Sequence, residues 1–188
     1  MNLKWLPNAI CIVRVLLVAP IVAALLQREF AAALALIIVA GASDVLDGFL
    51  AKTFDWRTRL GSLLDPAADK LLLTSVFLSL TYLGLVPIGL TAIVIARDVV
   101  IVLGAVTYQM LIGPVKGEPT AISKLNTACQ LLFVFCTILH AGFDWPPRML
   151  LVLLGAAVVF TSVTSGLNYV LSWSKRAWQM RHSDGTAA

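Results

Sequence analysis

The chain has 188 residues, of which 60% are hydrophobic and only 13% are charged, and its formal net charge is +4. A soluble domain carries about 25% charged residues. The composition therefore excludes an ordinary soluble domain and predicts an all-α integral membrane protein. Apolar residues extend along the whole chain, so we expect a single membrane domain over residues 1–188, with a polar cytoplasmic tail at 174–188.

Six apolar segments follow one another along the chain, separated by short links that are polar or contain proline. A helix needs roughly 20 apolar residues to cross a bilayer. The segments run over residues 8–26, 30–54, 61–84, 88–112, 121–141 and 149–173. The sequence therefore predicts six transmembrane helices.

The basic residues predict the orientation of these helices. Only Arg28 and Arg148 fall on one side of the predicted membrane. The opposite side, which includes both termini, holds Lys4, Arg57, Arg59, Lys116, Lys175, Arg176 and Arg181. Because loops rich in Lys and Arg remain in the cytoplasm, we expect both termini to be cytoplasmic. The predicted location is a bacterial cytoplasmic membrane.

Four aspartates lie at the cytoplasmic boundary of the second and third segments. Asp44 and Asp47 are spaced i, i+3, and Asp65 and Asp69 are spaced i, i+4, so each pair shares one face of a helix. The polar link at 55–59 lets the second of these helices fold back beside the first. Four carboxylates in a low-dielectric setting repel one another and are costly to desolvate. Hard divalent cations, Mg²⁺, Mn²⁺ or Ca²⁺, are the simplest counter-charge.

Other ionisable residues also fall within or beside the apolar segments. They are Arg14, Lys52, Lys70, Arg97, Asp98 and Lys124. Such residues inside spans are functional hypotheses by default. The alternative is internal ion pairing that only holds helices together, with Lys70 snorkelling to the interface and Asp98 neutralising a neighbouring cation.

The stretch DVLDGFLAKTFDWRTRLGSLLDPAADK, residues 44–70, carries a recognisable spacing of Asp, Gly and Ala. This spacing resembles the signature of the CDP-alcohol phosphotransferase family. The chain matches every fixed position of the signature except Lys52, where the family usually has Arg. Lysine keeps the charge but loses the bidentate fork of arginine.

The resemblance extends beyond the signature. PNAICIVR at 7–14 is similar to the opening of family members, with Cys11 where threonine is common. GSLLDPAADKLL, SLTYLGLVPIGLTAIVIARDVVIV and PTAISKLNTACQLL look most like the cardiolipin synthases of the family and are close to its phosphatidylglycerophosphate synthases.

The resemblance implies a role for each matching residue. Asp69 would be the general base that takes the proton of the acceptor hydroxyl. Two divalent cations, Mg²⁺ or Mn²⁺, would be bound by Asp44, Asp47, Asp65 and Asp69. CDP-diacylglycerol would contact Pro7, Asn8, Ala9, Ile10, Gly48, Lys52, Thr58 and Gly61. The acceptor phosphate would be held by Arg97, Lys124 and Arg14. The resemblance also implies a homodimer.

Three questions stay open at this point. A cation transporter also places carboxylates in the membrane, although usually near the midplane and with broken helices. A catalytically silent membrane scaffold is the second alternative. Within the enzyme class the acceptor is either phosphatidylglycerol, which we rank first, or glycerol 3-phosphate. Nucleic acid is not an expected partner, because the basic residues form a membrane-side bias without a nucleic-acid motif.

Overall fold

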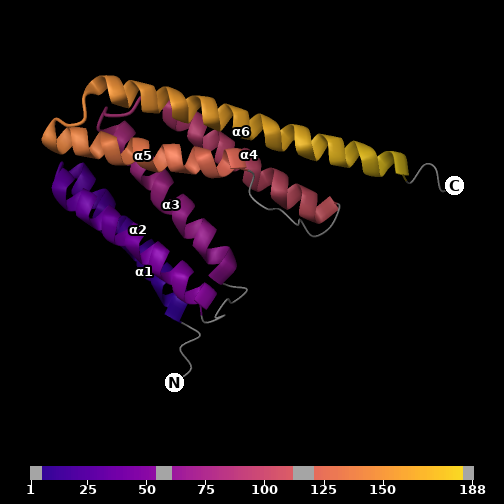
Figure 1. Cartoon of the computed structure of the whole chain (residues 1–188), viewed down its shortest axis with the longest axis horizontal. Helices are drawn as coiled ribbons and strands as arrows, with labels where there is room; N and C mark the ends of the chain where they lie inside the picture. The colour runs from indigo at the N-terminus through magenta and orange to yellow at the C-terminus, as the bar shows by residue number, and fades with distance from the viewer. Residues whose placement is uncertain (1–5, 54–60, 112–120, 184–188) are drawn as a thin grey trace. The chain divides into compact units, whose positions relative to one another are not determined.

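The computed structural model describes residues 6–53, 61–111 and 121–183, with side chains described at 12–43, 68–104, 107 and 121–169. Every regular element in these ranges is a helix (Figure 1). The helices are α1 (Leu6–Leu26), α2 (Phe30–Thr53), α3 (Gly61–Tyr82), α4 (Ile88–Leu111), α5 (Ala121–Phe143) and α6 (Arg148–Ser183). The all-α prediction is confirmed for the described part of the chain.

The six helices begin and end close to the predicted bounds, with one exception. We expected the sixth helix to end at residue 173, with a frayed polar tail after it, but α6 continues to Ser183. That prediction was wrong because it equated the end of the apolar run with the end of the helix. The segment from Ser174 to Ser183 contains no glycine or proline, and its Lys, Arg, Gln and Met residues are good helix formers.

The contacts divide the chain into two compact units. The first unit comprises residues 1–87 and 134–148, and the second comprises 88–133 and 149–188. In the first unit, α1 packs against both α2 and α3 (Figure 1). Ile21 and Leu25 of α1 and Phe77 and Leu80 of α3 are completely buried. These apolar side chains stabilise the unit that carries all four predicted metal-binding aspartates.

Two helices of the first unit end in the same hydrogen-bonded motif. After α1, the Glu29 amide donates to the Ala24 carbonyl at 2.9 Å, and Arg28 adopts a φ of 60°. After α3, the Leu85 amide donates to the Leu80 carbonyl at 2.9 Å, and Gly84 adopts a φ of 74°. This is the Schellman ending, in which a left-handed residue satisfies the last free carbonyls of a helix.

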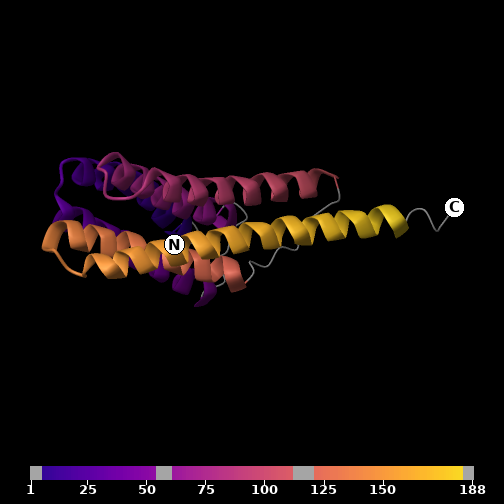
Figure 2. The same ribbon diagram turned by 90° about the horizontal axis from the view of Figure 1, so that it is seen from above.

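In the second unit, α5 up to Phe133 and α6 from Met149 run antiparallel and lie side by side in both views (Figure 1, Figure 2). Gly155 of α6 makes a close approach possible. A Cβ added at Gly155 would lie 3.3 Å from Cδ1 of Leu90 and 3.4 Å from Cε2 of Phe133. The glycine therefore lets α6 approach the apolar side chains of α4 and α5 in this unit.

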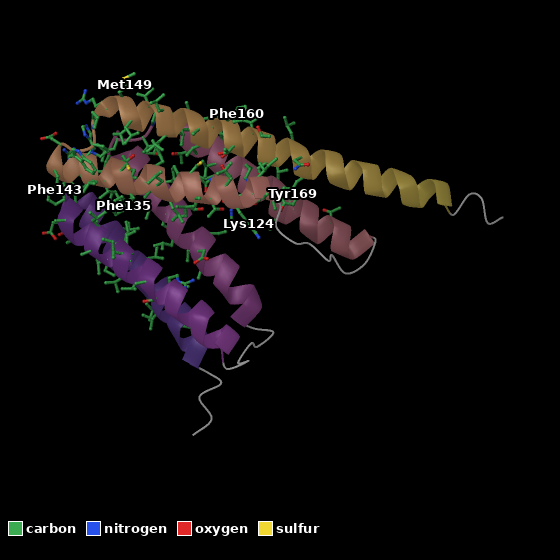
Figure 3. The ribbon with its side chains drawn as sticks, viewed as in Figure 1. Lys124, Phe135, Phe143, Met149, Phe160 and Tyr169 are labelled. Carbon is green, nitrogen blue, oxygen red and sulfur yellow. The ribbon has the colours of Figure 1, made fainter. Side chains whose placement is uncertain are left out.

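In the part of the chain that the structure describes, two helical stretches are long and apolar enough to cross a membrane, at Ala121–Phe143 and Arg148–Tyr169. Within the described residues, the apolar stretches Ile12–Leu26 and Phe30–Ser43 are shorter. Large apolar side chains are exposed on all six helices. Met149 and Phe160, for example, project outward from α6 (Figure 3) and are 75% and 71% exposed.

Candidate active site

The four predicted metal-binding aspartates lie on two helices of the first unit. Asp44 and Asp47 belong to the later half of α2, and Asp65 and Asp69 belong to the first half of α3. The backbone of each pair is helical, as the spacing predicted. The side chains of Asp44, Asp47 and Asp65 lie outside the described residues, so their joint binding of metal stays a prediction.

Asp69, the predicted general base, forms an ion pair with Arg14 of α1. The Arg14 Nη1 donates to the Asp69 Oδ1 at 2.7 Å. The arginine side chain is 1% exposed, whereas the aspartate side chain is 52% exposed. A buried guanidinium is costly to desolvate and needs a carboxylate partner. The pair therefore holds one oxygen of Asp69 against α1 and leaves the carboxyl group open to solvent or ligand.

The contact bears on two predicted roles of these residues. We expected Arg14 to bind the acceptor phosphate. The structure places Arg14 beside Asp69, the predicted base. The contact of Arg14 with a phosphate stays a prediction. Arg14 can orient Asp69 directly, because a charge-assisted hydrogen bond at this distance is among the stronger polar contacts.

Divalent metal fits the chemistry of this donor set. The four side chains offer only carboxylate oxygens, which are the ligands that Mg²⁺ and Mn²⁺ prefer. Asp69, the member whose side chain is described, keeps about half of its surface exposed and is accessible to a cation. Among the side chains that the structure describes, no three His, Cys, Asp or Glu residues form a cluster.

In the second unit, Arg97 is the centre of a polar network. Its Nη1 donates to the Asp98 Oδ1 at 2.7 Å, and its Nη2 donates to the hydroxyl groups of Ser123 and Ser165. The Arg97 side chain is 4% exposed and that of Asp98 is 13% exposed. The expectation that Asp98 neutralises a neighbouring cation is confirmed. The network presents a buried cation whose net charge is largely offset.

Lys124, the second predicted acceptor cation, differs from Arg97 in its exposure. It lies near the start of α5 (Figure 3), and its side chain is exposed. The ammonium group is thus accessible at the end of α5 that follows the predicted cytoplasmic loop. Arg97 and Lys124 thus belong to the same unit, but Arg97 is buried and Lys124 is exposed.

The remaining predicted contacts with CDP-diacylglycerol lie where side chains are not described. Pro7, Asn8, Ala9 and Ile10 belong to the first turns of α1, and Gly48 and Lys52 belong to α2. Gly61 is the first residue of α3, and Thr58 lies outside the described residues. These assignments stay predictions.

A set of buried polar residues in the second unit was not among the predicted site residues. Asn126 and Gln130 of α5 and Ser162 and Ser165 of α6 are completely buried. The Asn126 Oδ1 accepts hydrogen bonds from the hydroxyl groups of Thr161 and Ser162, both at 2.8 Å. The available signal was the spacing of polar residues at i, i+3, i+4 and i+7 inside apolar helices, which places them on one face.

Comparisons of the sequence with known proteins identify its family. The family model for CDP-alcohol phosphatidyltransferases matches residues 4–164. A cardiolipin synthase (CMP-forming) of Homo sapiens is 33% identical over 180 residues, which cover 87% of this chain and 60% of the human protein. A protein of the same name from Streptomyces coelicolor is 34% identical over 180 residues, covering 89% of this chain and 77% of the relative.

A third relative has a different name. The CDP-diacylglycerol–glycerol-3-phosphate 3-phosphatidyltransferase of Bacillus subtilis is 31% identical over 143 residues, covering 71% of this chain and 69% of that protein. The chain spans about 60% of the length of the mammalian relatives. The resemblance inferred from the signature at residues 44–70 is confirmed, and the chain belongs to the CDP-alcohol phosphatidyltransferase family.

Proposed function

We propose that the protein transfers the phosphatidyl group of CDP-diacylglycerol to phosphatidylglycerol, forming cardiolipin and releasing CMP. In this reaction the terminal hydroxyl oxygen of the acceptor forms a new bond to the phosphatidyl phosphorus. The bond between that phosphorus and the oxygen it shares with CMP breaks, and its electron pair leaves with CMP. Family membership supports the reaction class, and the names of the human and Streptomyces relatives support the acceptor.

Asp69 would take the proton of the attacking hydroxyl. A general base must reach the proton that it removes, and the Asp69 carboxylate is half exposed. Arg14 would hold the carboxylate in one orientation through the contact at 2.7 Å. The pair thereby presents the carboxylate in a fixed position.

Asp44, Asp47, Asp65 and Asp69 would hold two divalent cations, Mg²⁺ or Mn²⁺. When bound, such ions neutralise charge on the phosphoryl oxygens and align the attacking and leaving oxygens. Gly48, Lys52 and the other residues matched to the family would contact the CDP-lipid.

The observation that favours a lipid acceptor is the ion pair between Arg97 and Asp98. A phosphodiester carries a single negative charge, whereas glycerol 3-phosphate is close to a dianion at neutral pH. Arg97 is buried, its charge is offset at 2.7 Å, and its Nη2 donates to the neutral hydroxyl groups of Ser123 and Ser165. A site of low net charge suits the singly charged diester better than the dianion.

The second candidate acceptor is glycerol 3-phosphate, which would give phosphatidylglycerophosphate. Two observations favour it. Lys124 is an exposed cation that could add a second positive charge beside a phosphate monoester. The Bacillus relative also carries that acceptor in its name.

The proposed setting is a bilayer crossed six times, with both termini in the cytoplasm of a bacterium. Within the described residues, two helices long and apolar enough to cross a membrane support this topology, as do the exposed apolar side chains on all six helices. Membrane lipids would then surround the protein and supply both substrates laterally. We also propose a homodimer, as the family resemblance implies.

The test is an assay of purified protein in lipid nanodiscs with CDP-diacylglycerol and Mg²⁺, offering each acceptor separately. We expect cardiolipin and CMP to form with phosphatidylglycerol, at a kcat/KM at least tenfold above that for glycerol 3-phosphate. Mass spectrometry of the lipid product identifies the reaction. Phosphatidylglycerophosphate as the sole product would reverse the ranking of the acceptors.

A further inference from the structure

The second unit contains a row of buried polar side chains that begins at Arg97. We call it the polar seam, and it consists of Arg97, Asn126, Gln130, Thr161, Ser162 and Ser165. Each of these residues is at most 8% exposed. Polar groups in a buried helical interface are unfavourable unless they are hydrogen-bonded, so each member of the seam needs a partner.

The seam is layered along α5 and α6. Arg97 donates to Ser165 at 2.8 Å, and one turn along α5 the Asn126 Oδ1 accepts from Thr161 and Ser162. Gln130 follows Asn126 by four positions, so the two amides are neighbours on one face of α5. Phe133 and Gly155 lie close to each other beyond Gln130 and end the polar row with an apolar contact.

Four buried atoms of the seam, the Arg97 Nε and three amide atoms, have no hydrogen-bond partner among the described residues. Among the described residues, the Gln130 Nε2, the Gln130 Oε1 and the Asn126 Nδ2 have no hydrogen-bond partner, although both side chains are 0% exposed. The hydroxyl groups of Thr161 and Ser162 are bonded within the same seam. Native proteins rarely leave buried polar atoms unsatisfied, and such atoms call for an explanation.

The two amide nitrogens match the accepting capacity of one alcohol group. The Asn126 Nδ2 and the Gln130 Nε2 both donate, and the oxygen of an aliphatic hydroxyl accepts through two lone pairs. Neither amide carries a charge, so the seam offers an uncharged oxygen site next to a cation whose charge Asp98 offsets.

We propose that Asn126 and Gln130 bind the secondary hydroxyl of the glycerol headgroup of the acceptor lipid, next to the phosphodiester held by Arg97. This assignment rests on the proposed function. It makes the two amides specificity-determining residues, because the headgroup hydroxyl accepts from two amide nitrogens that have no partner among the described residues. The terminal hydroxyl of the same glycerol stays available for attack.

The test exchanges Gln130 for an apolar residue of similar size. Gln130→Met removes two unmatched buried polar atoms at little change in volume. We expect the Tm of the variant in nanodiscs to equal or exceed that of the wild type. We also expect the KM for phosphatidylglycerol to rise about tenfold, as the loss of one hydrogen bond predicts. The kcat and the KM for CDP-diacylglycerol should change less than twofold.

Thr127→Val is the matched control, because Thr127 is an exposed residue of the same helix whose hydroxyl donates to the Ser123 carbonyl. We expect it to keep the wild-type KM for both substrates. A role of Gln130 in helix packing alone would leave the KM for phosphatidylglycerol unchanged in Gln130→Met. That result would overturn the proposal.

A substrate analogue sharpens the test. Phosphatidyl-1,3-propanediol keeps the terminal hydroxyl and lacks the secondary one. The wild type should use it with a KM about tenfold above that for phosphatidylglycerol, whereas the two KM values should differ less in Gln130→Met, which keeps only the Asn126 donor. Equal KM values for both lipids in the wild type would contradict the assignment.

A binding measurement separates this proposal from the proposed reaction. Dihexanoyl phosphatidylglycerol should raise the Tm of the wild type more than its propanediol analogue does, and the difference should be smaller in Gln130→Met. If the wild type makes no cardiolipin but shows this difference, the proposed function fails and the amide site stands. If it makes cardiolipin without the difference, the amide site fails alone.

Discussion

Arg14 is a buried cation on α1, and its carboxylate partner belongs to α3. The signature at residues 44–70 was enough to predict Asp69 as a candidate base, because the pattern of aspartates is local in the sequence. It could not predict the contact of Asp69 with Arg14, since the two residues are 55 positions apart and meet only through the packing of α1 on α3. The same holds for Arg97, whose partners Ser123 and Ser165 lie on two other helices.

Asp69→Asn tests the base and its ion pair together. We expect turnover to fall at least 10²–10⁴-fold, which is roughly the contribution of a general base, because an amide cannot take the proton. Folding should persist, since the Asn oxygen can still accept from Arg14. The loss of charge should lower the free energy of unfolding by about 1 kcal/mol, because the Asp69 side chain is 52% exposed. Single-turnover kinetics and thermal unfolding measure the two effects.

Asp144→Asn is the control for this substitution. Asp144 is exposed and has a φ of 55°, a conformation that asparagine also tolerates. The control should keep wild-type turnover and stability. If Asp69→Asn retained most of its activity beside such a control, another group would be the base.

At the scale of single helices, apolar length and proline positions predicted the bounds of five helices well. They failed at the end of α6, where polar residues continue the helix to Ser183. Hydropathy reports where a helix meets lipid, whereas the helical backbone ends where residues with poor helix propensity begin. The sequence pattern also did not predict the close approach at Gly155, because that approach depends on side chains of α4 and α5.

Gly155→Leu tests that approach. A side chain at this position must displace the Leu90 and Phe133 atoms at 3.3 and 3.4 Å, so we expect the free energy of unfolding to fall by about 1–3 kcal/mol. Gly41→Leu on α2 is the control, because a Cβ there meets nothing within 4 Å. Thermal unfolding in the same detergent compares the two variants. Equal stability of both would show that Gly155 is not a packing constraint.

At the scale of the molecule, composition predicted an all-helical chain, and the structure adds its division into two compact units. The predicted catalytic aspartates and Arg14 belong to the first unit, and the predicted acceptor cations Arg97 and Lys124 belong to the second. Sequence periodicity cannot reveal this division, because it arises from contacts between helices that are distant in the chain. The single domain over residues 1–188 stays a prediction.

Metal dependence is the prediction that involves the whole enzyme. Excess EDTA should abolish turnover, because four carboxylates cannot align a charged phosphoryl group without counter-charge. Added Mg²⁺ or Mn²⁺ should restore it, whereas Na⁺ at matched ionic strength should not. Release of radiolabelled CMP from CDP-diacylglycerol follows the reaction. Undiminished turnover in EDTA would rule out the two-metal interpretation.

The ion pair between Arg14 and Asp69 also has a consequence for how the chain is made. Synthesis at roughly 5–20 residues per second adds the 55 positions that separate them in about 3–11 seconds. In the proposed topology, α1 leaves the ribosome and enters the bilayer during that interval without the carboxylate of α3. Insertion of an arginine near the centre of a helix costs about 2.5–3.5 kcal/mol. Directly after synthesis, α1 is therefore a poor membrane anchor. Its insertion becomes stable only when α3 is synthesised and Asp69 pairs with Arg14.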